Sequence, residues 1–95
     1  MLKPHFDPLI HEPNRLQICA YLDSISEVEF QALREYLDLS ESALSKHIKA
    51  LESADYIKAV KRGVGRKRTW IAFSDSGRRA FKDHVQALQR MIGVP

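Results

Sequence analysis

The period of the hydrophobic pattern changes near residue 56, and this change constrains the fold more than any other feature. Before it, apolar residues recur every three or four positions, most clearly at Leu44, Ile48 and Leu51. This spacing is typical of a helix that buries one face. After it, the segments YIKAVKR and TWIAF are rich in β-branched and aromatic residues and flank a segment with two glycines. These signals predict a β-hairpin with a long loop, placed after a set of helices.

Helices are predicted on both sides of the hairpin. Residues 14–23 carry apolar side chains at helical spacing and form the first helix. Ser40 offers an N-cap for a helix that ends near Ala54, and Ser74 offers the N-cap of a last helix. The sequence therefore predicts a mostly α fold with a small β-hairpin, in the order α-(β)-α-α-β-β-α.

The start of the second helix is open. Phe30, Leu33 and Leu37 have the spacing of a short helix. Ser26 and Glu29 fit a capping box that would begin this helix, whereas residues 28–30 could instead form a strand of two or three residues. Only the second alternative adds a short strand before this helix.

The size and composition of the chain favour a single domain over residues 1–95. No apolar run approaches the roughly 18–20 residues that cross a bilayer, and the first residues lack the features of a signal peptide. The single cysteine, Cys19, excludes an internal disulfide framework. These features favour a reduced, cytoplasmic setting without membrane contact.

The net charge of +3 hides an uneven distribution of charged residues. Residues 1–57 contain five basic and ten acidic side chains, whereas residues 58–82 contain nine basic side chains and one acidic side chain. Such segregation is typical of a surface that binds a polyanion, although a basic surface can also serve solvation alone.

The segment LDLSESALSKHIKALE has the parts of a helix-turn-helix: the end of a short helix, a tight turn and a serine-capped second helix. Small or cationic side chains cover the outward face of the second helix, over residues 41–54. They would let this helix approach a DNA groove closely and contact phosphates, although the same shape also serves purely structural roles. The predicted DNA-contacting residues are Ser42, Ala43, Ser45, Lys46 and Lys49.

The segment KRGVGRKRTW, residues 61–70, follows this helix closely and contains five basic residues. Gly63 and Gly65 permit the positive φ angles of a hairpin tip. A nucleotide-binding loop would need the spacing GxxxxGK[ST] before a helix, and a disordered basic tag would not be flanked by strands. A basic hairpin after a recognition helix is the arrangement of a winged helix-turn-helix, whose wing lies on the DNA backbone or in the minor groove. The predicted contacts in this wing, about residues 61–69, are Arg62, Arg66, Lys67 and Arg68.

The chain resembles the winged-helix DNA-binding domain of small MarR/ArsR-type transcriptional regulators. It contains LS-x-S-x-LS-x-H-[LI]-x-x-LE, then a strand, a basic wing and S-x-x-GR-x-AF, and the resemblance extends from about Asp7 to Phe81. It implies a homodimer that binds pseudo-palindromic operator DNA. The residues implied to contact DNA are Ser42, Ser45, Lys46, Lys49 and residues 66–68.

The resemblance also implies that the first and last helices form the dimer interface. Independently, the apolar stripe of the last helix is wider than so small a core needs, which is typical of a surface that contacts another chain. We expect the interface to contain Leu9, Ile10, Val85, Leu88, Met91 and Ile92. Two other functions stay open: an adaptor whose basic hairpin docks on an acidic partner, and binding to structured RNA.

Two aspartates depart from the pattern of the family. Asp38 lies in the turn of the helix-turn-helix and Asp55 follows the recognition helix, where many relatives have glycine. Aspartate tolerates the left-handed conformation better than most residues, so we expect both turns to form at a modest cost. Their negative charge disfavours tight DNA binding.

Neither catalysis nor a cofactor is predicted, because the sequence contains no catalytic triad and no cofactor fingerprint. His5, His11 and His84 lack a second ligand pair at helical spacing, so no metal site is expected. Cys19 lies in an apolar stripe, which favours core packing over redox sensing. The sequence names no small-molecule effector.

Two more residues have two interpretations each. His47 flanks the core face of the third helix, which favours a half-buried side chain over a base contact. Trp70 either covers a cross-strand neighbour or contacts a partner subunit.

Overall fold

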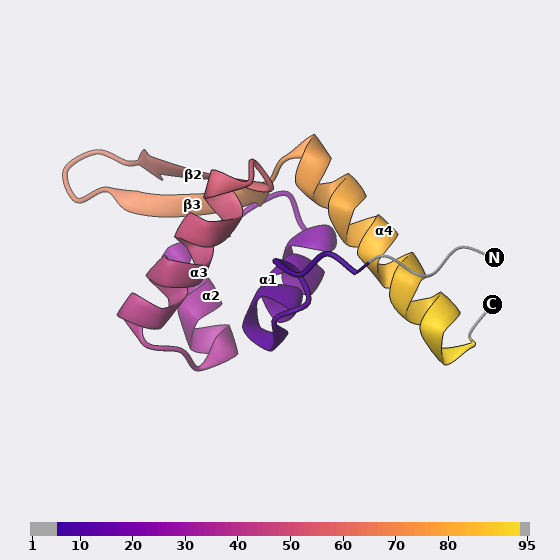
Figure 1. The fold of residues 1–95 in the computed structure, drawn as a ribbon. Coiled ribbons are helices and arrows are strands. Elements are labelled where there is room, and N and C mark those ends of the chain that lie inside the picture. The colour runs from indigo at the N-terminus through magenta and orange to yellow at the C-terminus, as the bar shows by residue number, and fades with distance from the viewer. Residues whose placement is uncertain (1–5, 94–95) are drawn as a thin grey trace.

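The computed structural model describes residues 6–93, which form four helices and a three-stranded sheet (Figure 1). In chain order the elements are α1 (Pro13–Asp23), β1 (Val28–Glu29), α2 (Phe30–Leu37), α3 (Glu41–Ser53), β2 (Ile57–Arg62), β3 (Arg68–Phe73) and α4 (Asp75–Ile92). The predicted element order is confirmed. Within residues 6–93, no helix has the length and apolar composition needed to cross a bilayer.

Polar side chains fix where the helices begin. The hydroxyl of Ser40 accepts from the N–H of Ala43 at 3.1 Å, and the hydroxyl of Ser74 accepts from the N–H of Gly77 at 2.9 Å. Both predicted N-caps are therefore confirmed. At α2 the capping-box alternative is wrong, because Glu29, the last residue of the short strand β1, is itself the N-cap.

The sheet is antiparallel, with β3 between β1 and β2. Val28 pairs with Ile71, which ties the two-residue strand β1 to the hairpin. Val60 pairs with Trp70, so Trp70 has the cross-strand neighbour that one interpretation predicts. The inner face of the sheet and the helices enclose one core. Its buried members include Ile18, Leu22, Leu33, Leu44, Ile48, Leu51, Ile57, Ile71 and Phe81.

Cys19 and His47 have the structural environments that their sequence positions favour. Cys19 is fully buried, and burial raises the pKa of its thiol to about 12, so it packs as a small apolar residue. His47 is half-buried and faces α1. Its Nδ1 lies 3.0 Å from Nη1 of Arg15, and its Nε2 lies 3.9 Å from the carboxylate of Glu12.

Asp38 and Asp55 both adopt the left-handed conformation. Asp38 has φ of 54° and forms the C-cap of α2, while Asp55 has φ of 60° in the turn between α3 and β2. The expected turn geometry is therefore confirmed at both positions. The turn at Asp55 receives two hydroxyl donors, since its carbonyl accepts from Ser74 and Ser76.

The segment before α1 is attached to α4 by polar contacts. The N–H of Asp7 donates to Nδ1 of His84 at 3.1 Å, and Nε2 of His84 lies 3.2 Å from Nδ1 of His11. The hydroxyl of Tyr56 donates to the carboxylate of Asp7 at 2.5 Å. Ile10 lies in this segment and is 0% exposed. Its predicted place in a dimer interface is therefore wrong, because its side chain is part of the core of its own chain.

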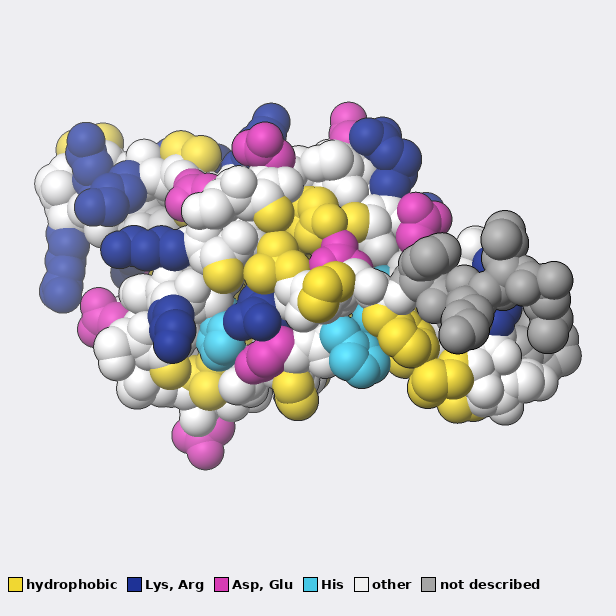
Figure 2. Space-filling model, in the orientation of Figure 1, with side chains coloured by type: hydrophobic (Ala, Val, Ile, Leu, Met, Phe, Trp, Pro, Cys, Tyr) yellow, Lys and Arg dark blue, Asp and Glu magenta, His cyan; other side chains and the backbone are white. Residues whose placement is uncertain are grey.

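The hairpin and α4 extend in opposite directions from the helical body (Figure 1), which gives the molecule dimensions of 56 × 25 × 21 Å. Lys and Arg side chains gather over the hairpin end in the view of Figure 2, whereas apolar side chains lie along the α4 end.

Candidate nucleic-acid interface

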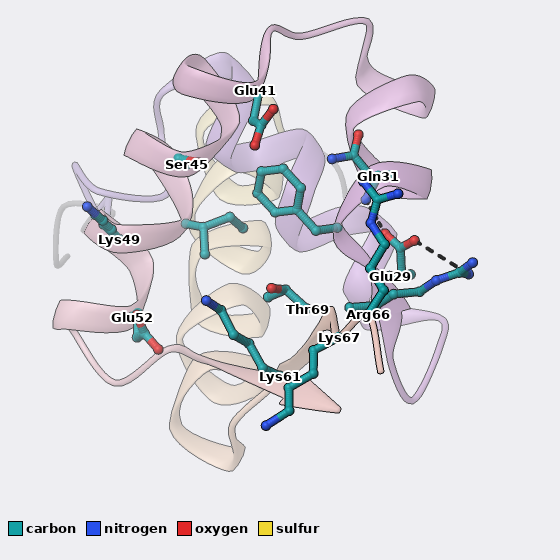
Figure 3. Close-up of a pocket in the computed structure, with 13 residues that line it drawn as sticks. Glu29, Gln31, Glu41, Ser45, Lys49, Glu52, Lys61, Arg66, Lys67 and Thr69 are labelled. Atoms are coloured by element: carbon teal, nitrogen blue, oxygen red, sulfur yellow. Dashed lines mark hydrogen bonds and ion pairs between the residues drawn. The ribbon is translucent and has the colours of Figure 1, made fainter. Parts of the chain in front are cut away.

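A cleft of about 660 Å³ separates α3 from the hairpin (Figure 3). Its walls come from α3, from the hairpin, and from β1 with the start of α2. We call it the α3–hairpin cleft, and its lining residues are Glu29, Phe30, Gln31, Glu41, Ser45, Ile48, Lys49, Glu52, Lys61, Arg66, Lys67, Arg68 and Thr69. The predicted recognition helix and the predicted wing therefore face one another across a single concave surface.

The five predicted DNA-contacting residues of α3 divide into three groups. Ser45 and Lys49 line the α3–hairpin cleft. Ser42 and Lys46 are exposed on the neighbouring face of the helix, outside the cleft wall. Ala43 is half-buried, and its N–H is bound by the N-cap Ser40. The cleft wall and the exposed face of α3 together present small and cationic side chains.

The predicted wing residues also divide. Arg66, Lys67 and Arg68 line the cleft and are exposed. The guanidinium of Arg68 lies 3.9 Å from the carboxylate of Glu29, a distance at which an exposed pair contributes little. Within residues 6–93, no ion pair involves Arg66 or Lys67. These two cations are therefore free to bind an anion.

Arg62 lies outside the α3–hairpin cleft. It donates to the carboxylate of Glu27 at 2.7 Å, and its guanidinium lies 5.0 Å from the centroid of the Trp70 ring. Arg62 therefore braces the outer face of the hairpin. There it lines a second hollow of about 420 Å³ together with Arg66 and Arg68, outside the α3–hairpin cleft.

Lys61, which was not among the predicted contacts, lines the α3–hairpin cleft, whereas Arg62 does not. In a strand, successive side chains point to opposite faces, so Lys61 shares the face of Ile57 and Ala59, which pack toward the core. Thr69, its partner in β3, also lines the cleft. Strand alternation read outward from Ile57 would have identified Lys61.

The cleft contains carboxylates that the sequence argument missed. Glu29 comes from β1, whereas Glu41 and Glu52 come from opposite ends of α3. The five cations of the cleft are Lys49, Lys61, Arg66, Lys67 and Arg68. The cleft is cationic overall, yet its α3 wall carries a negative charge near each end.

Residues 6–93 contain no group of three or more His, Cys, Asp or Glu side chains placed to hold a metal ion. His11 and His84 do contact one another, but as a hydrogen-bonded pair that joins the segment before α1 to α4. His5, the third histidine of the sequence argument, lies outside the described residues.

Comparison with known proteins supports the same type of site. The family model described as a winged helix DNA-binding domain matches residues 14–92. An uncharacterized protein of Methanocaldococcus jannaschii is 32% identical over 78 residues, which are 81% of this chain and 85% of that protein. Both matches include α3 and the hairpin.

Solved structures share the fold. A transcriptional regulator homologue from Pyrococcus horikoshii OT3 superposes with a TM-score of 0.86 at 28% identity, covering 90% of this chain and 85% of that one. YusO of Bacillus subtilis gives a TM-score of 0.78 at 17% identity, covering 85% of this chain and 57% of that one. The structure of reduced AbfR bound to DNA gives a TM-score of 0.73 at 19% identity, covering 83% of this chain and 55% of that one. The predicted winged-helix DNA-binding domain is therefore confirmed by the family model, and these solved structures share its fold.

Proposed function

Since the chain belongs to the winged helix DNA-binding domain family, we propose that it is a transcriptional regulator that binds double-stranded DNA sequence-specifically as a homodimer. One observation supports this more than any other: α3 and the wing line the same cationic cleft. A duplex seated there would contact both elements at once. The family and the fold are those of DNA-binding regulators rather than enzymes.

In this proposal α3 enters the major groove. Recognition helices contact base edges mainly through their N-terminal residues, which here include Ser42 and Ala43 after Glu41. Ser42 and Ser45 would lie against the groove, while Lys46 and Lys49 would bind phosphates on its walls. Because phosphate contacts carry no sequence information, selectivity would come from the serines and from the shape of the DNA.

The wing would contact the DNA backbone or the adjacent minor groove. Arg66, Lys67 and Arg68 supply three exposed cations there, and Lys61 lines the same cleft. Neutralised phosphates release counterions, so the logarithm of the affinity falls by about 0.9 per contact for each tenfold rise in salt.

Salt titration of a wing variant tests the proposal. Arg66, Lys67 and Arg68 are changed together to alanine, and binding to duplex DNA is followed by fluorescence anisotropy between 50 and 200 mM salt (roughly the range over which such contacts are lost). The salt slope should flatten by up to about 2–3 units for each bound subunit. The matched control changes Lys58, Arg79 and Lys82, three exposed cations outside the cleft.

The control variant should keep the wild-type slope, because it loses the same charge at a distance from the cleft. An unchanged slope in the wing variant would exclude the wing from the interface.

If the wild-type chain fails to bind random duplex at low salt, the adaptor with an acidic protein partner becomes the better function. Preference for RNA over DNA duplex in competition would favour RNA binding instead. A cytoplasmic location is part of the same proposal.

A further inference from the structure

We infer that Glu52 restrains the affinity for DNA by holding a carboxylate against the phosphates that the α3–hairpin cleft would bind. This inference rests on the proposed function, since it assigns a role to a residue of the same interface. It would make Glu52 a determinant of the sequence-independent part of DNA binding.

Glu52 lies in the last turn of α3 and is exposed on the cleft wall (Figure 3). Lys49 and Lys61 line the same cleft, yet neither lies within ion-pair distance of Glu52. Across residues 6–93, no hydrogen bond or ion pair involves its carboxylate. Its charge is therefore not neutralised within its own chain.

The position of Glu52 on the helix is also unfavourable. The C-terminal end of a helix carries a partial negative charge, so a carboxylate in the last turn destabilises the helix. The other two carboxylates of the cleft have structural roles. Glu41 lies in the favourable first turn of α3, whereas Glu29 is the N-cap of α2. Among the three, Glu52 alone combines an unfavourable helix position with a carboxylate that makes no hydrogen bond or ion pair to the described residues.

A phosphate bound between α3 and the wing would be attracted by the cations of the cleft and repelled by Glu52. Every duplex carries the same phosphates, so the repulsion would weaken operator and random DNA alike. Contacts to base edges would then supply a larger share of the total binding. Two unit charges about 6–8 Å apart in water repel by roughly 0.5–0.7 kcal/mol, which corresponds to about a two- to threefold loss of affinity.

The substitution Glu52→Gln tests the inference, because it removes the charge and keeps the shape. The matched control is Glu35→Gln, which removes one exposed carboxylate of α2 outside the cleft. Both variants and the wild-type chain are titrated against a random-sequence duplex by anisotropy at several salt concentrations. Glu52→Gln should bind about two to three times more tightly per subunit at low salt.

This gain should shrink as salt rises, since screening already weakens the repulsion in the wild-type protein. Glu35→Gln should bind as the wild-type chain does, and Glu52→Gln should be at least as resistant to urea as the wild type. Equal affinities for the two variants would overturn the inference and leave the proposed function intact. Failure of all three proteins to bind any duplex would overturn both.

Discussion

At Gly77 the structure has no room for a single methyl group. A Cβ at this position in the first turn of α4 would lie 1.9 Å from the carbonyl oxygen of Tyr56. Helix propensity alone would favour Gly77→Ala by about 1 kcal/mol. The clash is with backbone that cannot rotate away, so we expect a net loss of about 2–4 kcal/mol in the free energy of unfolding.

Urea unfolding followed by circular dichroism measures this loss. Gly65→Ala is the control, because Gly65 has φ of +77° but open space around it. That substitution should cost only about 1 kcal/mol, the cost of a left-handed alanine. Similar losses at the two glycines would contradict the packing argument.

His84 is the one buried polar residue among those the structure describes, and it predicts a dependence of stability on pH. Its Nδ1 accepts from the N–H of Asp7, so its Nε2 carries the proton and donates to His11. Burial, with the neighbouring His11, lowers the pKa of His84, while the Asp7 carboxylate opposes this shift. Tyr56 and Cys19 are the other titratable groups around Asp7.

A histidine with a lowered pKa binds its proton more readily in the unfolded chain. The stability that it contributes is therefore complete above its ordinary pKa of about 6.5 and is lost as pH falls from there toward the lowered pKa. The loss is about 1.4 kcal/mol for each unit of pKa shift. Urea unfolding of the wild-type chain and of His84→Asn at pH 8 and pH 5 measures it. Equal losses in both proteins would refute the role of His84.

At the scale of elements, local patterns predicted the structure well. The caps at Ser40 and Ser74 and the stripes of the helices depend on residues at most a few positions apart, and these are visible in the sequence. The β-branched segments predicted the hairpin for the same reason. Even the left-handed turns at Asp38 and Asp55 followed from local backbone preferences.

The parts of the interface that the sequence argument missed depend on contacts between distant segments. Glu29 and Gln31 reach the cleft only because β1 pairs with β3, some 40 positions along the chain. Arg62 turned out to be engaged with Glu27, and Ile10 to be buried beneath the N-terminal turn. The charge or hydrophobicity of a residue can suggest that it lies on a binding surface. Long-range packing determines which surface it joins, or whether it is buried in the core.

At the scale of the whole molecule, α4 has two faces with different environments. His84 and Ala87 are buried in the described structure, whereas Met91 is 57% exposed and Ile92 is 67% exposed. Leu9, Val85 and Leu88 are half-buried. An apolar stripe at the end of an elongated molecule, remote from the cationic hairpin, fits the proposed dimer interface because both clefts could then face one duplex.

The substitution Ile92→Glu would place a charge in this stripe without disturbing the core, since the side chain is mostly exposed in a single chain. We expect the wild-type protein to sediment as a dimer and Ile92→Glu to sediment as a monomer, because burying an unpaired carboxylate at an interface is unfavourable. Gln89→Glu, which adds the same charge at an exposed polar position of α4, should remain dimeric. Ile92→Glu should also lose the preference for a duplex with two half-sites about 10 bp apart, while its affinity for one half-site is kept. A wild-type chain that sediments as a monomer at micromolar concentration would contradict the proposed homodimer, whereas a dimeric Ile92→Glu would place the interface elsewhere.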